Sequence, residues 1–325
     1  MNDMHLDRQL YDADIPQESM RKGFGRGLKR AGDKDLRVVA LCGDLTESIQ
    51  MQEFREAYPE RFVEVGVAEQ NLVTVASGMA SMGKIPFAGS YAAFSPGRNW
   101  EQIRTTICIN DQAVKIVGSH AGLNVGPDGA THQMLEDIAL MRVLPNMVVV
   151  APGDSFEAEK ATMALAKNGK PSYLRLAREA SAVFTTPLTP FEIGKAYVLR
   201  EGTDVTLLGT GPMTYQCLLA AEQLSHEGIS AEVVHVPTIK PLDETTILDS
   251  LRKTHHGVTV EEAQVAGGFG SAVAEMLAEK MPTPLRRIGV QDKFGESGKA
   301  SELLAHFGLD AHSIVKVAHE LVKGL

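Results

Sequence analysis

One glycine-rich loop gathers residue types that can transfer protons and bind hydroxyl groups. His120, Asp128 and His132 fall within thirteen positions, and the segment between them is too polar for a core element. Histidine exchanges protons near neutral pH, and a carboxylate accepts hydrogen bonds from hydroxyls. A metal site is the rival interpretation, because the same residue types are metal ligands. We rank it lower, since the loop lacks an i, i+4 helical histidine pair and no fourth ligand is evident.

A second candidate, Glu69, lies where a predicted strand gives way to a helix of small residues. A glutamate in the first turn of a helix complements the helix dipole, and that alone would explain it. However, the flanking residues are apolar, Val67 and Leu72 among them, so the carboxyl is expected to be desolvated and to favour its protonated form. A protonated carboxyl can donate a hydrogen bond to a ring nitrogen.

A third candidate segment directly follows the predicted strand 37–42. It places Asp44 and the hydroxyls of Thr46 and Ser48 within five positions. Taken alone, these side chains are best interpreted as caps of the next helix. They become functional candidates only because the other two candidate segments also occur in this sequence.

Strands and helices must position these residues, and the pattern predicts an α/β fold. Apolar β-branched strings alternate with helical patterns, which is typical of βαβ units and mostly parallel sheets. In such sheets, ligands bind beyond the carboxyl ends of the strands, where all three segments fall. The expected strands are 37–42, 62–65, 85–88, 114–117, 147–150, 172–176, 205–208, 231–235, 257–260 and 285–288. The expected helices open near Pro16 and cover 50–57, 68–82, 98–107, 135–142, 155–166, 214–227, 244–253, 270–280 and 311–325.

The elements group into two consecutive α/β domains. Residues 185–190 hold two prolines and three threonines between patterned stretches, which indicates a linker. We therefore expect an N-terminal extension at 1–15, a first domain at 16–184 and a second domain at 191–325. No side chain of the second domain stands out as a reacting group, so its expected role is subunit contact.

Composition excludes several classes of protein. The 325 residues carry 32 Lys and Arg against 41 Asp and Glu, a net charge of −9, which argues against nucleic-acid binding. The hydrophobic fraction of 44% is enough for a core, and no apolar run is long enough to span a membrane. The polar, acidic N-terminus is unlike a secretory signal, so a cytoplasmic protein is expected. Cys42, Cys108 and Cys217 are far apart and are expected to be reduced and buried.

At these residues the sequence resembles the C-terminal portion of the transketolase family of thiamine diphosphate enzymes. That portion is a pyrimidine-binding domain followed by a transketolase C-terminal domain, and the resemblance runs from about Arg21 to the end. Its most specific element is the loop 120–133, which ends in Asp-Gly-Ala-Thr-His-Gln. Phe94 with residues 96–98, together with 144–146 and 292–298, supports it. The Gly-Gly-Phe-Gly at 267–270 imitates a dinucleotide loop, but in this context we interpret it as a helix-start packing motif.

The resemblance implies roles for residues around the cofactor. Glu69 matches the glutamate that hydrogen-bonds the pyrimidine N1′ and so activates thiamine diphosphate. Phe94 matches the aromatic residue that stacks on the pyrimidine, and Tyr91 matches another member of that pocket, although core packing would explain aromatics at this spacing equally well. Asp44 and Leu45 match residues near the thiazolium side.

The resemblance also implies a substrate site for sugar phosphates. The positions that hold the terminal phosphate are matched by Arg21, Ser48, His120 and Arg178, while Asp128 and His132 match contacts to the donor's hydroxyls and reacting end. Arginine suits phosphate because its planar fork binds two oxygens and stays charged. Arg175, within the predicted strand, is interpreted instead as a structural ion-pair residue. Glu69, His120 and His132 are the implied catalytic residues.

These matches favour transketolase chemistry, the transfer of a two-carbon ketol unit from a ketose phosphate to an aldose phosphate. Deoxyxylulose-phosphate synthases, which use pyruvate, share a similar loop but carry arginine where His120 stands. The alternative is therefore a synthase-like, acyloin-forming subunit, and a non-enzymatic regulatory or scaffold subunit is a third reading. Dehydrogenase β-subunits for 2-oxo acids lack the pair of Asp128 and His132.

One expected motif is missing. The family holds the cofactor's diphosphate and Mg²⁺ with a Gly-Asp-Gly motif and a later asparagine, and no Gly-Asp-Gly occurs in this sequence. The resemblance therefore implies a separate N-terminal transketolase subunit that binds Mg²⁺, homodimerisation of this chain, and an α2β2 heterotetramer. Metal ligands are not expected in this chain.

Overall fold

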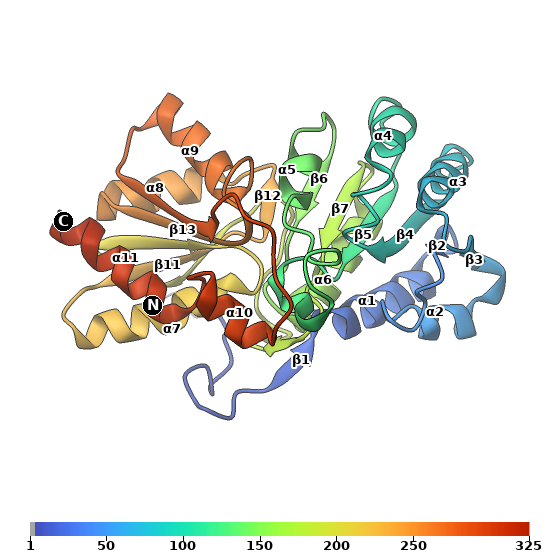
Figure 1. The fold of residues 1–325 in the computed structure, drawn as a ribbon. Helices are drawn as coiled ribbons and strands as arrows, with labels where there is room; N and C mark the ends of the chain where they lie inside the picture. The colour runs from blue at the N-terminus through green and yellow to red at the C-terminus, as the bar shows by residue number, and fades with distance from the viewer. Residues whose placement is uncertain (1–3, 325) are drawn as a thin grey trace.

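The computed structural model describes residues 4–324 and contains two main sheets that lie side by side (Figure 1). The first has seven strands in the order β12-β6-β7-β5-β4-β2-β3. Their bounds are β2 Val38–Cys42, β3 Phe62–Glu64, β4 Ile85–Tyr91, β5 Lys115–Ser119, β6 Val148–Val150, β7 Ser172–Arg175 and β12 Thr238–Lys240. Every pairing is parallel except that of β12 with β6. The predicted α/β class with mostly parallel sheets is confirmed.

Helices cover both faces of this sheet, because its strands alternate between two cores. Along β2, Val38, Ala40 and Cys42 belong to one core, and Val39 and Leu41 to the other. The first face carries α1 Met20–Lys34, α2 Gln52–Ala57 and α6 Ser155–Lys167. The second carries α3 Glu69–Ser81, α4 Trp100–Gln102, the π-helix Ile103–Cys108 and α5 Asp137–Arg142 (Figure 1).

Helices α1 and α6 pack closely because glycine faces the contact. A Cβ atom added at Gly23 would lie 1.9 Å from the carbonyl oxygen of Ser155, so a side chain there would push the helices apart. Asp154 is the N-cap of α6, and its side chain accepts a hydrogen bond from Glu157 N at 3.0 Å.

The second sheet has five strands in the order β14-β13-β10-β11-β9, and only β9 pairs antiparallel. The strands are β9 Tyr197–Arg200, β10 Val205–Gly209, β11 Ala231–His235, β13 Gly257–Gln264 and β14 Leu285–Val290. The helices are α7 Met213–His226, α8 Glu244–Thr254, α9 Phe269–Lys280, α10 Ala300–His306 and α11 Ala311–Lys323. At the start of α9, the amides of Phe269 and Gly270 each donate to the Glu261 carboxylate at 2.7 Å, which confirms the helix-start interpretation of the Gly-Gly-Phe-Gly motif.

Several expected boundaries are wrong where tertiary pairing decides the local structure. The helix expected from Pro16 begins only at Met20, because Gln17–Ser19 forms strand β1, which pairs with β8 Ala180–Ala182. The expected helix 98–107 is a short α4 followed by a π-helix, and strands β9 and β12 and helix α10 were not expected. The short helices Pro59–Arg61 and Leu123–Asp128 complete the elements.

The junction between the two halves is held by specific contacts. Thr185 of the expected linker donates from N and Oγ1 to Asp154, at 2.6 and 2.8 Å, and Lys160 Nζ donates to the carbonyl oxygens of Thr186 and Thr189. Strand β12 follows this segment in sequence yet pairs with the first sheet. The domain limits 16–184 and 191–325 stay predictions, and residues 1–3 of the expected extension and 325 of the last helix lie outside the described residues.

Two further expectations concern chemistry rather than topology. Cys42, Cys108 and Cys217 are free and buried, as expected, and burial raises the pKa of the Cys42 thiol to about 11. Between residues 4 and 324, no helix is long and apolar enough to cross a membrane.

Candidate active site

The candidate residues meet at the carboxyl ends of β2, β4, β5 and β7. Asp44, Tyr91, His120 and Arg178 stand at or just beyond the ends of these four strands. Asp44 and His120 have φ angles of 61° and 56°, a left-handed conformation that side chains other than glycine rarely adopt. Such backbone persists only where surrounding contacts hold it, and it is concentrated at functional sites.

Glu69 is the first residue of α3, and its side chain is only 2% exposed. Arg98 Nη1 donates to Glu69 Oε2 at 2.8 Å. Asn99 Nδ2 donates to the Glu69 carbonyl oxygen at 2.7 Å and to Ser95 Oγ at 3.1 Å. The expected burial of the carboxyl is confirmed, and the structure adds a counter-charge, Arg98, that the sequence did not predict.

Four rings form a cluster close to these residues. Tyr91 stacks on His120 with centroids 3.8 Å apart and on Phe94 with centroids 5.8 Å apart. His132 meets Phe94 edge-on, with centroids 5.5 Å apart. Tyr91 Oη also lies 2.6 Å from Ser48 Oγ. The residues matched to the cofactor and those matched to the substrate are therefore in contact with one another.

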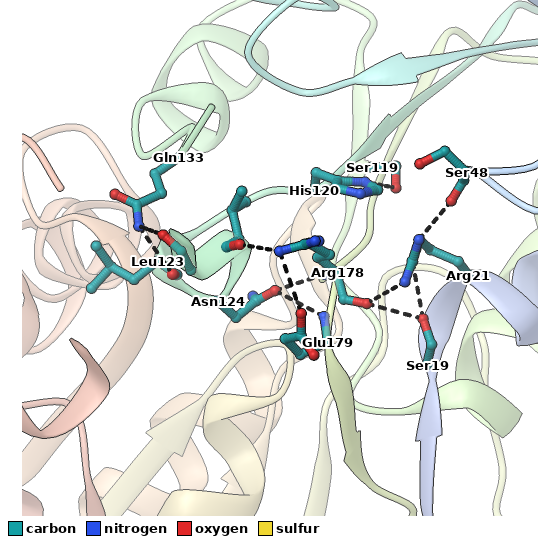
Figure 2. A network of polar contacts seen from close by, with 12 residues as sticks. Ser19, Arg21, Ser48, Ser119, His120, Leu123, Asn124, Gln133, Arg178 and Glu179 are labelled. Atoms are coloured by element: carbon teal, nitrogen blue, oxygen red, sulfur yellow. Dashed lines mark hydrogen bonds and ion pairs between the residues drawn. The ribbon is translucent and has the colours of Figure 1, made fainter. Parts of the chain in front are cut away.

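Arg21 and Arg178, 157 positions apart in sequence, lie together beside this cluster (Figure 2). Arg21 donates to the carbonyl oxygen of Ser48 at 2.6 Å, to that of Arg178 at 2.7 Å and to Ser19 Oγ at 3.0 Å. None of these acceptors carries a charge. Burial and, after it, the positive charge of Arg178 lower the pKa of Arg21, yet a guanidinium stays protonated at neutral pH. Two guanidinium groups side by side, one of them without a charged acceptor, make this place suited to an anion.

His120 is buried against these cations. Burial, followed by the charges of Arg21, Arg178 and His132, lowers the pKa of His120 to about 3. Its Nδ1 lies 2.9 Å from Ser119 Oγ. A neutral imidazole held in this way can donate one N–H to a substrate oxygen and accept a proton at its other nitrogen.

This neutral His120 predicts a loss of stability on acidification. The unfolded ring takes up a proton below about pH 6.5 and the folded ring does not, so the unfolded state binds more protons and gains stability as the pH falls. At pH 5 the free energy of unfolding should drop by about 2 kcal/mol through this residue, and above pH 6.5 the effect should vanish. Urea unfolding of the wild type and of His120→Gln at pH 5 and pH 7.5 measures it. An NMR titration of the His120 ring with a midpoint near 6.5 would contradict this expectation.

Residues of the second half of the chain form hydrogen bonds with the loop 120–133, which carries part of the site. Glu262 of β13 accepts hydrogen bonds from Asn124 N at 2.6 Å and from Asn124 Nδ2 at 3.1 Å. Asn124 Oδ1 in turn accepts from Arg178 N at 2.6 Å, and Gln133 Nε2 donates to the Glu296 carbonyl oxygen at 2.8 Å. Burial raises the pKa of Glu262. These hydrogen bonds show that the second half of the chain positions Arg178. They do not test the subunit contact that was expected as the role of this half.

The structural role expected for Arg175 is confirmed. Its Nε donates to Asp137 Oδ2 at 2.8 Å, both side chains are buried, and Tyr173 Oη donates to the same oxygen at 2.7 Å. Arg175 Nη2 also donates to the Glu262 carbonyl oxygen at 2.8 Å. These bonds occupy its guanidinium and fasten the first sheet to the second half of the chain.

The remaining predicted residues lie at the rim. Asp44 and Asp128 are exposed and Leu45 is half-buried. The backbone amide of Asp44 donates to Glu64 Oε1 at 2.7 Å, and that of Leu45 donates to Cys42 Sγ at 3.3 Å. Within residues 4–324, no group of three or more His, Cys, Asp or Glu side chains is placed to hold a metal ion.

Sequence reasoning missed Arg98, Asn99, Asn124 and Glu262 as members of the site. Arg98 belongs to a motif that supported the resemblance, but the sequence does not show that it pairs with Glu69. Asn124 lies inside the predicted loop and could have been singled out as a polar residue there. Nothing in the strand-like sequence around Glu262 indicates that its carboxylate supports a distant loop.

Comparisons with known proteins agree with this arrangement. The transketolase pyrimidine-binding domain family matches residues 17–182, and the transketolase C-terminal domain family matches residues 194–314. A Methanocaldococcus jannaschii protein assigned as a transketolase C-terminal section is 45% identical over 94% of this chain and 97% of its own length. A 6-deoxy-6-sulfo-D-fructose transketolase subunit from a Clostridium species is 42% identical over 97% of this chain and 98% of its own length.

A solved structure is similar over the same span. It is described as a split-gene transketolase, an inactive β4 tetramer, and it superposes with a TM-score of 0.88 at 42% identity, covering 94% of this chain and 98% of that one. The relatives are thus separate chains of about the same length as this one.

Proposed function

Because this chain belongs to the transketolase family and matches its separate C-terminal sections, we propose that it is the β-subunit of a two-subunit transketolase. The reaction is the transfer of a two-carbon ketol unit from a ketose phosphate to an aldose phosphate. One observation carries the proposal: a continuous series of contacts joins the buried Glu69 carboxyl group to Arg21 and Arg178 through Arg98, the Phe94 and Tyr91 rings and Ser48. Such an arrangement suits a planar nitrogen ring at one end and a phosphate at the other.

The family's pyrimidine-binding domain implies thiamine diphosphate, and the residues present fit its pyrimidine end. Glu69 is a buried hydrogen-bonding partner for a ring nitrogen, and the stacked rings of Phe94 and Tyr91 supply flat faces. A planar cation, the Arg98 guanidinium, already contacts Glu69 and lies 4.9 Å from the Phe94 ring centroid. When bound, the cofactor supplies the nucleophilic carbon that accepts the two-carbon unit. Asp44 and Leu45 would lie toward its thiazolium side.

The chain's own residues would orient the sugar and move its protons. Arg21, Ser48, Arg178 and the N–H of His120 would hold the terminal phosphate, and Asp128 and His132 would bind the donor's hydroxyls. His120 and His132 would act as proton donors and acceptors, because an imidazole ring can donate a proton from one nitrogen and accept one at the other. Holding the substrate at its far end fixes the reacting carbon in place.

A separate N-terminal subunit completes the enzyme in this proposal. It would bind the diphosphate and Mg²⁺, for which this chain has no Gly-Asp-Gly motif, and it would join two copies of this chain in an α2β2 heterotetramer. The solved split-gene relative is described as an inactive β4 tetramer, which supports both self-association and the need for a partner. We place the enzyme in the cytoplasm, in pentose phosphate metabolism.

A second candidate is a synthase-like subunit that condenses pyruvate with an aldehyde. A 1-deoxy-D-xylulose-5-phosphate synthase from Thermomicrobium roseum is 39% identical over 90% of this chain, which spans 47% of that protein. These synthases carry arginine at the position of His120. The histidine in this chain therefore favours transketolase over synthase chemistry.

The test is reconstitution. This chain is mixed with its N-terminal partner, thiamine diphosphate, Mg²⁺, xylulose 5-phosphate and ribose 5-phosphate, and sedoheptulose 7-phosphate is measured. We expect product only with both subunits. Pyruvate consumption with CO₂ release would favour the synthase reading, and product formed by this chain alone would overturn the split architecture. A scaffold role predicts that substitutions at Glu69 leave the activity intact.

A further inference from the structure

Arg98 occupies the two groups that the proposed function reserves for the cofactor ring. Its Nη1 donates to Glu69 Oε2 at 2.8 Å, and its guanidinium carbon lies 4.9 Å from the centroid of the Phe94 ring. A guanidinium is planar, carries N–H donors in its plane and stacks on aromatic faces. An aminopyrimidine is also planar, stacks, and presents a ring nitrogen to a carboxyl group.

We propose that Arg98 is a place-holder for the pyrimidine ring: it covers the Glu69 carboxylate and the Phe94 face in the chain without cofactor and leaves both when the cofactor binds. This inference rests on the proposed function. It assigns Arg98 a task that neither the sequence nor the resemblance indicated, namely to oppose cofactor binding until the ring displaces it.

The burial of Glu69 explains why such a residue is needed. A carboxylate that is 2% exposed and has no counter-charge would be costly, so the chain needs a compensating cation before the cofactor arrives. Arg98 supplies it from a side chain that is 52% exposed, and so its guanidinium has open solvent into which it can move. The exchange therefore requires no rearrangement of the core.

The two occupants exclude each other chemically as well as sterically. Arg98 Nη1 donates to Glu69 Oε2 at 2.8 Å, so this oxygen is already engaged and is not free for a hydrogen bond with a ring nitrogen. The ion pair is accordingly an inactive arrangement of the site.

Glu69 itself is held by contacts that do not involve Arg98. Asn99, which is fully buried, donates from Nδ2 to the Glu69 carbonyl oxygen at 2.7 Å and to Ser95 Oγ at 3.1 Å. The Arg98 backbone is fixed separately, since its N–H donates to the Phe94 carbonyl oxygen at 3.0 Å. Departure of the Arg98 side chain thus leaves the carboxyl group in position to receive the ring.

The experiment measures the dissociation constant of thiamine diphosphate in the assembled two-subunit complex, by calorimetry at fixed Mg²⁺. Arg98→Ala should bind the cofactor about tenfold more tightly, because the ion pair no longer has to be broken. Arg98→Lys keeps the charge on Glu69 and should stay near the wild-type value. Arg104→Ala, a matched change at an exposed arginine of the adjoining helix, should have no effect.

The same measurement in a Glu69→Gln background separates this inference from the proposed function. If Arg98 acts through Glu69, the gain from Arg98→Ala should disappear there, as a double-mutant cycle would show. An unchanged or larger dissociation constant in Arg98→Ala overturns the place-holder, whatever the enzyme's activity. Absence of transketolase activity in the assembled wild-type complex overturns the proposed function instead. If Arg98→Ala does not assemble, Arg98→Gln, which removes the charge but keeps a planar amide, is interpreted in the same way.

Discussion

Replacing Glu69 with glutamine is expected to lower kcat of the assembled enzyme by about 10³-fold. The amide keeps the size of the side chain and its backbone contacts with Asn99, but it cannot exchange a proton with a ring nitrogen. Proton transfer by one positioned group contributes about 10² to 10⁴ to a rate, and the buried position of Glu69 leaves little room for water to replace it. The measurement is the steady-state rate of sedoheptulose 7-phosphate formation at saturating thiamine diphosphate, so that weaker cofactor binding does not enter.

Glu101→Gln is the matched control for this variant. Glu101 is an exposed residue of the nearby helix α4, and the same change of acid to amide there should leave kcat within about twofold. A Glu69→Gln enzyme that keeps more than a tenth of the wild-type rate would show that the carboxyl is not the activating group. Circular dichroism and size-exclusion chromatography verify that both variants fold and assemble.

The central elements of the fold could be predicted because local pattern and tertiary environment agree. Strand β2 is a continuous apolar run, as expected of a parallel strand buried on both faces, and helix α6 carries its own start signal in Asp154. The pairing of strands, by contrast, depends on residues that are distant in the sequence. Residues Gln17–Ser19 became a strand only because Ala180–Ala182 lies opposite, and nothing in either triplet specifies the other.

The site was predictable to a similar degree. The resemblance identified Arg21 and Arg178, and the structure brings them together through a hydrogen bond to the Arg178 carbonyl oxygen at 2.7 Å. What the sequence could not supply is the partner of each charge. Glu69 was expected to be a desolvated carboxyl, and it is buried, but its ion-pair partner is Arg98, 29 positions away. An exposed arginine after a glycine gives no sign of that pairing in the sequence.

The net charge at the proposed phosphate site follows from the contacts of Arg21, Arg178 and His120. Burial lowers the pKa of His120 to about 3, so at neutral pH the positive charge beside it comes from Arg21 and Arg178 rather than from its own ring. Arg21 is held by three uncharged acceptors and Arg178 Nη1 by the Val125 carbonyl oxygen, with Glu179 Oε1 3.5 Å away at an exposed position. Arg21 is therefore a cation without a carboxylate hydrogen-bond partner, and Arg178 is paired only with an exposed carboxylate, an arrangement suited to a phosphate anion.

Truncating Arg178 to alanine is accordingly expected to lower kcat/KM for ribose 5-phosphate by about 10² to 10³-fold. The loss should be confined to the phosphorylated acceptor, since a charge-assisted contact to a group remote from the reacting carbon acts by positioning it. With the unphosphorylated ketose erythrulose as donor in every assay, kcat/KM for ribose itself should change by less than about threefold. The ratio of the two acceptors, rather than either rate alone, is the quantity to compare.

Lys22→Ala removes the same charge from an exposed position next to Arg21 and should leave that ratio unchanged, which excludes a general loss of electrostatic attraction as the cause. Arg178→Lys should recover part of the ratio, because lysine restores the charge but not the planar fork. Equal losses for ribose and ribose 5-phosphate would refute the assignment: they would mean that the Arg178 side chain acts through the loop it holds, by the hydrogen bond from Nη1 to the Val125 carbonyl oxygen, and that the phosphate is bound elsewhere.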